Sequence, residues 1–144
     1  MEEGFRLWAN PSSPHAEGRK ARAALEDARE RIKRMLGWEG ELIFTSGASE
    51  ALALAISRCV QPLAGVSVVE HEAVLRHAGD AMRIPVDGLG LVDPAVCALP
   101  GLVAVQQANN ETGVLQDVAA LARAARAAGA WFHTDAVQAL GKVA

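Results

Sequence analysis

The fold is decided by residues 102–135, LVAVQQANNETGVLQDVAALARAARAAGAWFHTD. Two short apolar runs in it, residues 102–106 and 130–134, are typical of strands. The alanine-rich residues 117–128 between them predict a helix that begins at an aspartate cap and is closed by Gly129. A strand, a helix and a second strand of this length form a crossover between parallel neighbours. The stretch therefore predicts an α/β layer.

The rest of the chain shows the same alternation. We expect helices at residues 15–36, 50–60, 71–81 and 93–99, and strands at residues 41–45, 65–70 and 83–86. Alternating elements of this kind predict a three-layer α/β fold with a mostly parallel sheet. A length of 144 residues fits one domain, so we expect a single domain over residues 1–144.

The charge balance argues against nucleic acid as a partner. The chain has 14 Lys and Arg against 17 Asp and Glu, a net charge of −3, so no basic surplus exists to bind phosphates. Its apolar runs are interrupted long before the roughly 20 residues that a membrane span needs, and its start lacks the form of a signal peptide. We expect a cytoplasmic globular protein with no membrane partner. Cys59 and Cys97 are expected to be reduced and at least partly buried.

Polar clusters follow the expected strands at residues 45–49, 70–71, 109–113 and 133–138. The carboxyl ends of parallel strands share one edge of a sheet, and ligands of open α/β sheets bind at that edge. The sequence therefore predicts that these clusters meet in one site.

Each cluster has a functional and a local interpretation. The turn Thr45-Ser46-Gly47-Ala48-Ser49 before a helix suits an anion, although such turns are common as simple caps. Asp135 can hold a cationic ring nitrogen or serve as a turn residue. The amides of Asn110 and Gln138 can donate to an oxygen of a ligand or lie exposed in turns. His71 can present its ring to a ligand or cap a helix. The histidine spacing predicts no metal site.

Five segments, taken in order, resemble one family. They are NPSSPHAEG (10–18), FTSGASEALALAI (44–56), EHEAVL (70–75), NNETGVLQD (109–117) and HTDAVQALGK (133–142). Together they are similar to the cysteine desulfurases, which are class V, fold-type I enzymes dependent on pyridoxal 5'-phosphate. The resemblance implies an aminotransferase-like large domain, of which this chain is the amino-terminal part.

The resemblance also implies roles for individual residues. Ala48 and Ser49 match the pair that binds the cofactor phosphate, and Asp135 matches the carboxylate at the ring nitrogen. His71 matches a histidine that stacks on the ring and assists proton transfer, and is the implied catalytic residue. The amides near the substrate and the phenolic oxygen correspond to Asn110 and Gln138.

Some positions depart from the family pattern. Ala53 stands where an asparagine is usual, and Gln107 where a histidine is common. The Schiff-base lysine and the sulfur-accepting cysteine of the family belong to segments that this sequence does not match. None of Lys20, Lys33 and Lys142 corresponds to that lysine, so we expect no covalent attachment at a matching lysine and no activity from this chain alone.

The implied function is therefore part of an enzyme that removes sulfur from L-cysteine, leaving L-alanine and an enzyme persulfide, as a source for iron–sulfur clusters. L-Cysteine or a related amino acid, a second copy of the chain and a sulfur-acceptor protein are the implied partners. The alternative is a truncated or diverged relative that serves as a non-catalytic binding module or survives as a remnant.

Overall fold

The computed structural model describes residues 8–143. The chain divides into two compact units, Met1–Phe44 and Thr45–Ala144, which are described separately below. The single domain expected over residues 1–144 remains a prediction.

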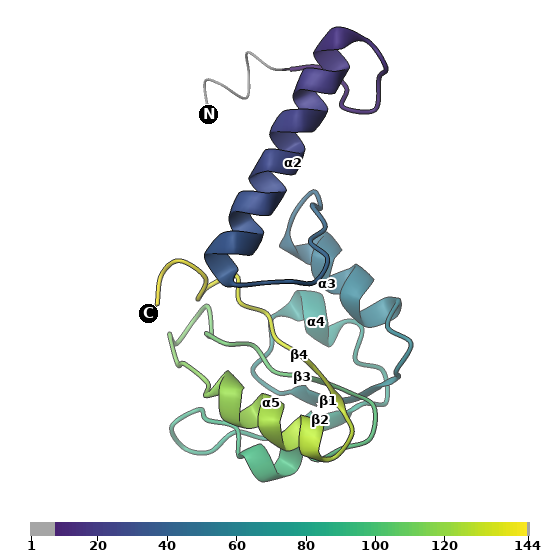
Figure 1. Cartoon of the computed structure of the whole chain (residues 1–144). Helices are drawn as coiled ribbons and strands as arrows, with labels where there is room; N and C mark the ends of the chain where they lie inside the picture. The colour runs from purple at the N-terminus through teal and green to yellow at the C-terminus, as the bar shows by residue number, and fades with distance from the viewer. Residues whose placement is uncertain (1–7, 144) are drawn as a thin grey trace. The chain divides into compact units, whose positions relative to one another are not determined.

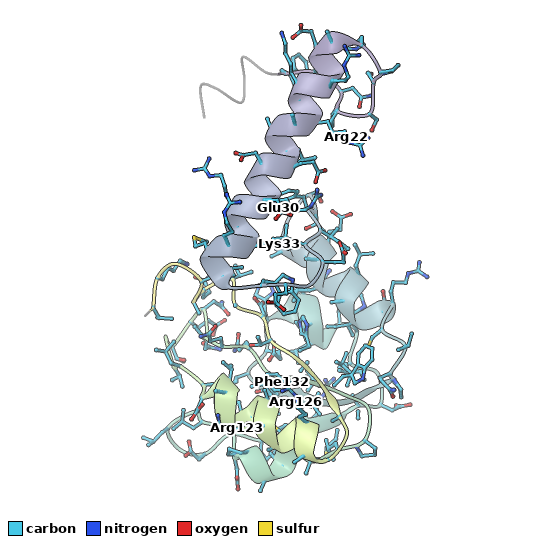
Figure 2. All side chains as sticks on the ribbon, in the orientation of Figure 1. Arg22, Glu30, Lys33, Arg123, Arg126 and Phe132 are labelled. Carbon is cyan, nitrogen blue, oxygen red and sulfur yellow. The ribbon has the colours of Figure 1, made fainter. Side chains whose placement is uncertain are left out.

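The first unit consists mainly of helix α2 (Ala16–Leu36), at the position that the sequence predicts. His15 caps its start, where Nδ1 accepts a hydrogen bond from the Gly18 amide at 3.1 Å. Gly37 ends it with a φ of 59°, a conformation that glycine adopts without strain. Half-buried Lys33 lies 3.8 Å from exposed Glu30 on the same helix (Figure 2), and at this separation the pair adds little stability.

The strand expected at residues 41–45 is wrong. This segment is irregular, and its Leu42 carbonyl accepts a hydrogen bond from Arg29 Nε at 2.9 Å. The guanidinium carbon of Arg29 also lies 5.2 Å from the ring centroid of Phe44. A side chain of α2 thus bonds a backbone carbonyl of the segment that was expected to form a strand.

The second unit contains a four-stranded parallel sheet in the order β2-β1-β3-β4 (Figure 1). Its strands are β1 (Leu63–Ser67), β2 (Met82–Ile84), β3 (Leu102–Ala104) and β4 (Trp131–His133). Its helices are α3 (Ala48–Ser57), α4 (Glu72–Leu75), the 3₁₀ helix η1 (Pro94–Cys97) and α5 (Val118–Ala127). The decisive stretch folds as β3, α5 and β4, with Asp117 capping α5 as predicted.

Helices cover both faces of this sheet. Val103 points into a cluster that includes Leu121 of α5 and Cys97 of η1. Its neighbour Ala104 points into a second cluster with Leu52 of α3 and Val74 of α4. Because successive residues of a strand face opposite sides, the two clusters lie on opposite faces. The predicted three-layer α/β architecture is confirmed.

Several elements are shorter than expected. The strand expected at residues 65–70 stops at Ser67, where the chain turns and the Glu70 amide donates to the Ser67 carbonyl at 3.3 Å. The helix expected at residues 71–81 is reduced to α4, and the chain passes Gly79 with a φ of 47°. The helix expected at residues 93–99 is the short η1, which begins at Pro94. All three elements therefore end earlier than the sequence predicts.

Neither cysteine is in a disulfide. Cys97 is buried and Cys59 is half-buried, as predicted. Burial raises the pKa of the Cys97 thiol, with a smaller contribution from Asp93. Within residues 8–143, no helix combines the length and the apolar character required to cross a membrane.

Replacing Leu121 by alanine tests the core of the second unit. Leu121 is 1% exposed, so we expect Leu121→Ala to lower the free energy of unfolding by about 2–5 kcal/mol, through lost burial and the cavity left behind. Leu89 is 74% exposed, and Leu89→Ala is the matched control, with an expected change within about 0.5 kcal/mol. Urea denaturation measures both values. Equal losses in the two variants would contradict the assigned core.

Candidate functional site

A pocket opens at the carboxyl edge of the sheet in the second unit. It is lined by Ala48, Ser49, Leu52, His71, Gln106, Ala108, Asn110, Asp135, Val137 and Gln138. All six residues that the sequence assigned to a site are among them. Four segments that are far apart in the sequence are thus brought together, although the binding roles of these residues remain predictions.

The amino terminus of α3 forms one wall of the pocket. The cap residue is Gly47, which has no side chain to bind the first amides of the helix. The turn before it is held by other bonds, because Ser46 donates from its amide and its hydroxyl to Glu50 Oε2 at 2.6 and 2.7 Å. These bonds lower the pKa of Glu50. The first amides of a helix lack partners within it, so those of Ala48 and Ser49 can donate to an anion.

His71 caps a helix and also lines the pocket. Its Nδ1 accepts a hydrogen bond from the Ala73 amide at 3.0 Å, which caps α4, and the residue also lines the pocket. A nitrogen that accepts a hydrogen bond carries no proton. The neutral ring therefore carries its proton on Nε2.

Asp135 likewise combines a turn role with a place in the pocket. Its Oδ1 accepts a hydrogen bond from the Val137 amide at 2.9 Å, and its carbonyl accepts one from the Gln107 amide at 2.9 Å. These bonds fix the carboxylate at the end of β4. Gln138, one turn further on, accepts a hydrogen bond at Oε1 from Lys142 Nζ at 2.7 Å.

Asn110 is exposed in the loop after β3. The loop is shaped by its neighbour Asn109, whose Oδ1 accepts hydrogen bonds from the amides of Glu111 and Thr112 at 2.9 and 2.8 Å. The Asn109 side chain therefore maintains the turn, and Asn110 is left facing the pocket.

Glu70 is a buried acid beside the pocket, and the sequence predicts no role for it. It is 6% exposed, its Oε1 accepts a hydrogen bond from the Gln106 amide, and its Oε2 is buried without a partner. Burial raises the pKa of Glu70 to about 7; the Gln106 amide opposes this and Asp135 adds to it. The only sequence signal was its position directly before His71.

His133 of β4 is a second buried titratable group near Asp135. Burial lowers the pKa of His133, and the charge of Asp135 partly offsets this effect. Its Nε2 and the Oγ1 of the adjacent Thr134 are buried without hydrogen-bond partners. Across residues 8–143, no three His, Cys, Asp or Glu side chains are grouped closely enough to hold a metal ion.

The comparisons with known proteins agree with the resemblance. Residues 2–144 match the family model described as aminotransferase class-V. A cysteine desulfurase of Cereibacter sphaeroides is 42% identical over 156 residues, covering 94% of this chain and 40% of the relative. The cysteine desulfurase NifS of Azotobacter vinelandii is 39% identical over 155 residues, covering 94% of this chain and 39% of the relative.

Solved structures show the same relationship. A NifS-like protein from Rickettsia africae has a TM-score of 0.86 at 32% identity and matches 99% of this chain and 45% of its own. SspA, solved in complex with cysteine, has a TM-score of 0.82 at 28% identity and matches 96% of this chain and 48% of its own. The chain spans about two fifths of the length of the curated relatives. It belongs to the aminotransferase class-V family, and the relatives from Cereibacter sphaeroides and Azotobacter vinelandii are named cysteine desulfurases.

Proposed function

We propose that this chain is the cofactor-binding part of a cysteine desulfurase and that its pocket binds pyridoxal 5'-phosphate. One observation carries the proposal: the six residues that the resemblance assigns to the cofactor come from four separate segments and line a single pocket. Residues that are matched to a family pattern by sequence alone lie together in one pocket only if the chain has the fold of that family.

The amino terminus of α3 fits the phosphate of the cofactor. The amides of Ala48 and Ser49 and the Ser49 hydroxyl supply donors, and the helix dipole favours negative charge there. A Cβ placed on Gly47 would meet no atom within 4 Å, so the turn leaves space on that side. Glu50 is held back by Ser46 and keeps its charge within the turn.

Asp135 fits the ring nitrogen. A fixed carboxylate at that nitrogen keeps it protonated, because the opposite charge favours the cationic form. When bound, the cofactor supplies an electron sink that stabilises negative charge at the α-carbon of an amino acid. Asp135 meets this requirement because its Oδ1 is anchored by Val137 and its orientation is set before any ligand arrives.

His71 is suited to hold a proton near the cofactor. Its Nδ1 is engaged by the Ala73 amide, so proton exchange is confined to Nε2 and the ring keeps its orientation during exchange. The side-chain amides of Asn110 and Gln138 lie on the same pocket and supply neutral donors for an oxygen of the ring or the substrate.

L-Cysteine is the proposed substrate of the whole enzyme, because the relatives are named for its desulfuration and SspA was solved with cysteine. A homodimer and a sulfur-acceptor protein remain part of the proposal. Within this chain, Lys20 and Lys33 belong to α2 and Lys142 bonds to Gln138 at the pocket. None matches the cofactor-bearing lysine of the family.

Binding of the cofactor tests the role of Asp135. We expect the 144-residue chain to bind pyridoxal 5'-phosphate, and Asp135→Asn to weaken binding about 10-fold or more through loss of a charge-assisted hydrogen bond. Asp80 is exposed in another turn, so Asp80→Asn is the control and should bind like the unaltered chain. Equilibrium dialysis gives the dissociation constants. Equal binding by all three proteins would remove Asp135 from the cofactor site.

Sulfide release tests the expected inactivity. We expect the chain with pyridoxal 5'-phosphate, L-cysteine and a thiol reductant to release no more sulfide than the cofactor without protein, because no lysine matches the catalytic one. The methylene-blue assay measures the sulfide. Release above that background would contradict the expectation, and its loss in Lys142→Met would identify the lysine responsible.

A further inference from the structure

We propose that Glu70 is a positioning residue for the pocket: its buried carboxyl ties the segment that carries His71 to the segment that carries Asn110, and its charge acts on Asp135. The tie between the two segments rests on the hydrogen bonds and the burial of Glu70 alone. The consequence for the cofactor rests on the proposed function.

The tie consists of hydrogen bonds between the segments that follow β1 and β3. The Gln106 amide donates to Glu70 Oε1, and Gln106 Nε2 donates to the Val69 carbonyl. Asn109 Nδ2 donates to the same carbonyl at 3.0 Å. Val69 and Glu70 directly precede His71, and Asn109 directly precedes Asn110. Two sides of the pocket are therefore held to each other at the residues where the functional side chains begin.

Because Glu70 is buried, ionisation of its carboxyl places an uncompensated charge beside the pocket. Oε2 is buried without a donor, so nothing there compensates the second oxygen of an ionised carboxyl. A pKa of about 7 means that both forms are populated near neutral pH. The acceptor bond at Oε1 is available in both forms, whereas the charge is present only above that value.

The surrounding charges identify Asp135 as the group that responds. The titratable groups around Glu70 are Asp135 after β4, His71 and Glu72 on its own segment, and Glu111 after β3, while His133 within β4 interacts with Asp135. Of these, Asp135 is joined to the residue next to Gln106, because the Gln107 amide donates to the Asp135 carbonyl at 2.9 Å, and its charge contributes to the raised pKa of Glu70. By reciprocity, ionised Glu70 makes the neighbourhood of Asp135 more negative, and a cation facing Asp135 holds its proton more firmly.

The variant Glu70→Gln removes the charge of Glu70 but keeps the hydrogen bond that ties the two segments together. The amide keeps the shape and an acceptor oxygen for the Gln106 amide, but it cannot ionise. The matched control is Glu72→Gln, which removes an exposed carboxyl two positions away on the same segment. Glu70→Ala removes the tie and the charge together.

The stability of the ligand-free chain gives the first readout. The pKa of Glu70 is raised from 4.5 to about 7 in the fold, so between these values the folded chain binds more protons than the unfolded chain. The contribution of Glu70 to stability is therefore complete below about pH 4.5 and is lost as the pH rises through 7. From pH 5 to pH 8, we expect the unfolding constant of the unaltered chain to rise at least about 10-fold relative to that of Glu70→Gln.

Urea denaturation at several pH values measures this ratio, and Glu72→Gln should follow the unaltered chain. A ratio that stays constant with pH would overturn the ionisation of Glu70.

Hydrogen exchange tests the tie: we expect the amides of residues 70–73 to exchange at least about 10-fold faster in Glu70→Ala, but not in Glu70→Gln. Unchanged exchange in Glu70→Ala would overturn the tie. If Glu70→Ala does not fold, the protection factor of the Gln106 amide in the unaltered chain, which corrects for the pH dependence of intrinsic exchange, decides the tie: protection of about 10-fold or more supports it, and exchange at the unprotected rate refutes it.

Affinity for pyridoxal 5'-phosphate at two pH values gives the second readout. At pH 6, Glu70 is mostly neutral, so we expect Glu70→Gln to bind the cofactor as the unaltered chain does. At pH 8, we expect it to bind at least about 3-fold more weakly, because the additional negative charge beside Asp135 is missing. Equal affinities at both pH values, or an equal loss at both, would overturn the charge role. Failure of the unaltered chain to bind cofactor would instead refute the proposed function, while the stability and exchange results would still decide the tie.

Discussion

The parallel register of β1, β3 and β4 is the constraint on which the pocket depends. Val66 pairs with Ala104, and Ala104 pairs with His133, so the three strands end at nearly the same level. The segments that follow them must then leave the sheet at one edge. A shift of one residue in any strand would also turn its side chains to the opposite face, and the two hydrophobic clusters oppose such a shift.

Local hydrogen bonds prepare the pocket for a ligand. His71 and Asp135 each use one atom to hold a nearby backbone amide, and this leaves the rest of the side chain in a fixed orientation. A cap or a turn bond is therefore compatible with a binding role and contributes to it, since a group oriented in advance loses less entropy on binding. The amino terminus of α3 adds donors for an anion to the pocket that Asp135 also lines.

The sequence predicted the layered fold and the convergence of the site because both follow from short-range patterns. Residues 102–135 contain a strand, a capped helix and a strand, and the structure keeps all three. The expected strand at residues 41–45 failed because its apolar run gave no sign that Arg29 would bind the Leu42 carbonyl. Glu70 was missed because its partner, Gln106, lies 36 residues away, and its burial arises only once β1 and β3 pair.

The most direct measurement of the central claim is a titration of the ¹⁵N-labelled chain with pyridoxal 5'-phosphate, followed by amide chemical shifts. We expect the largest shifts at four separated places: Ala48 and Ser49, His71, Asn110, and residues 135–138. Large shifts confined to the surroundings of Lys20 and Lys33, or no saturable shifts at the carboxyl edge of the sheet, would contradict it.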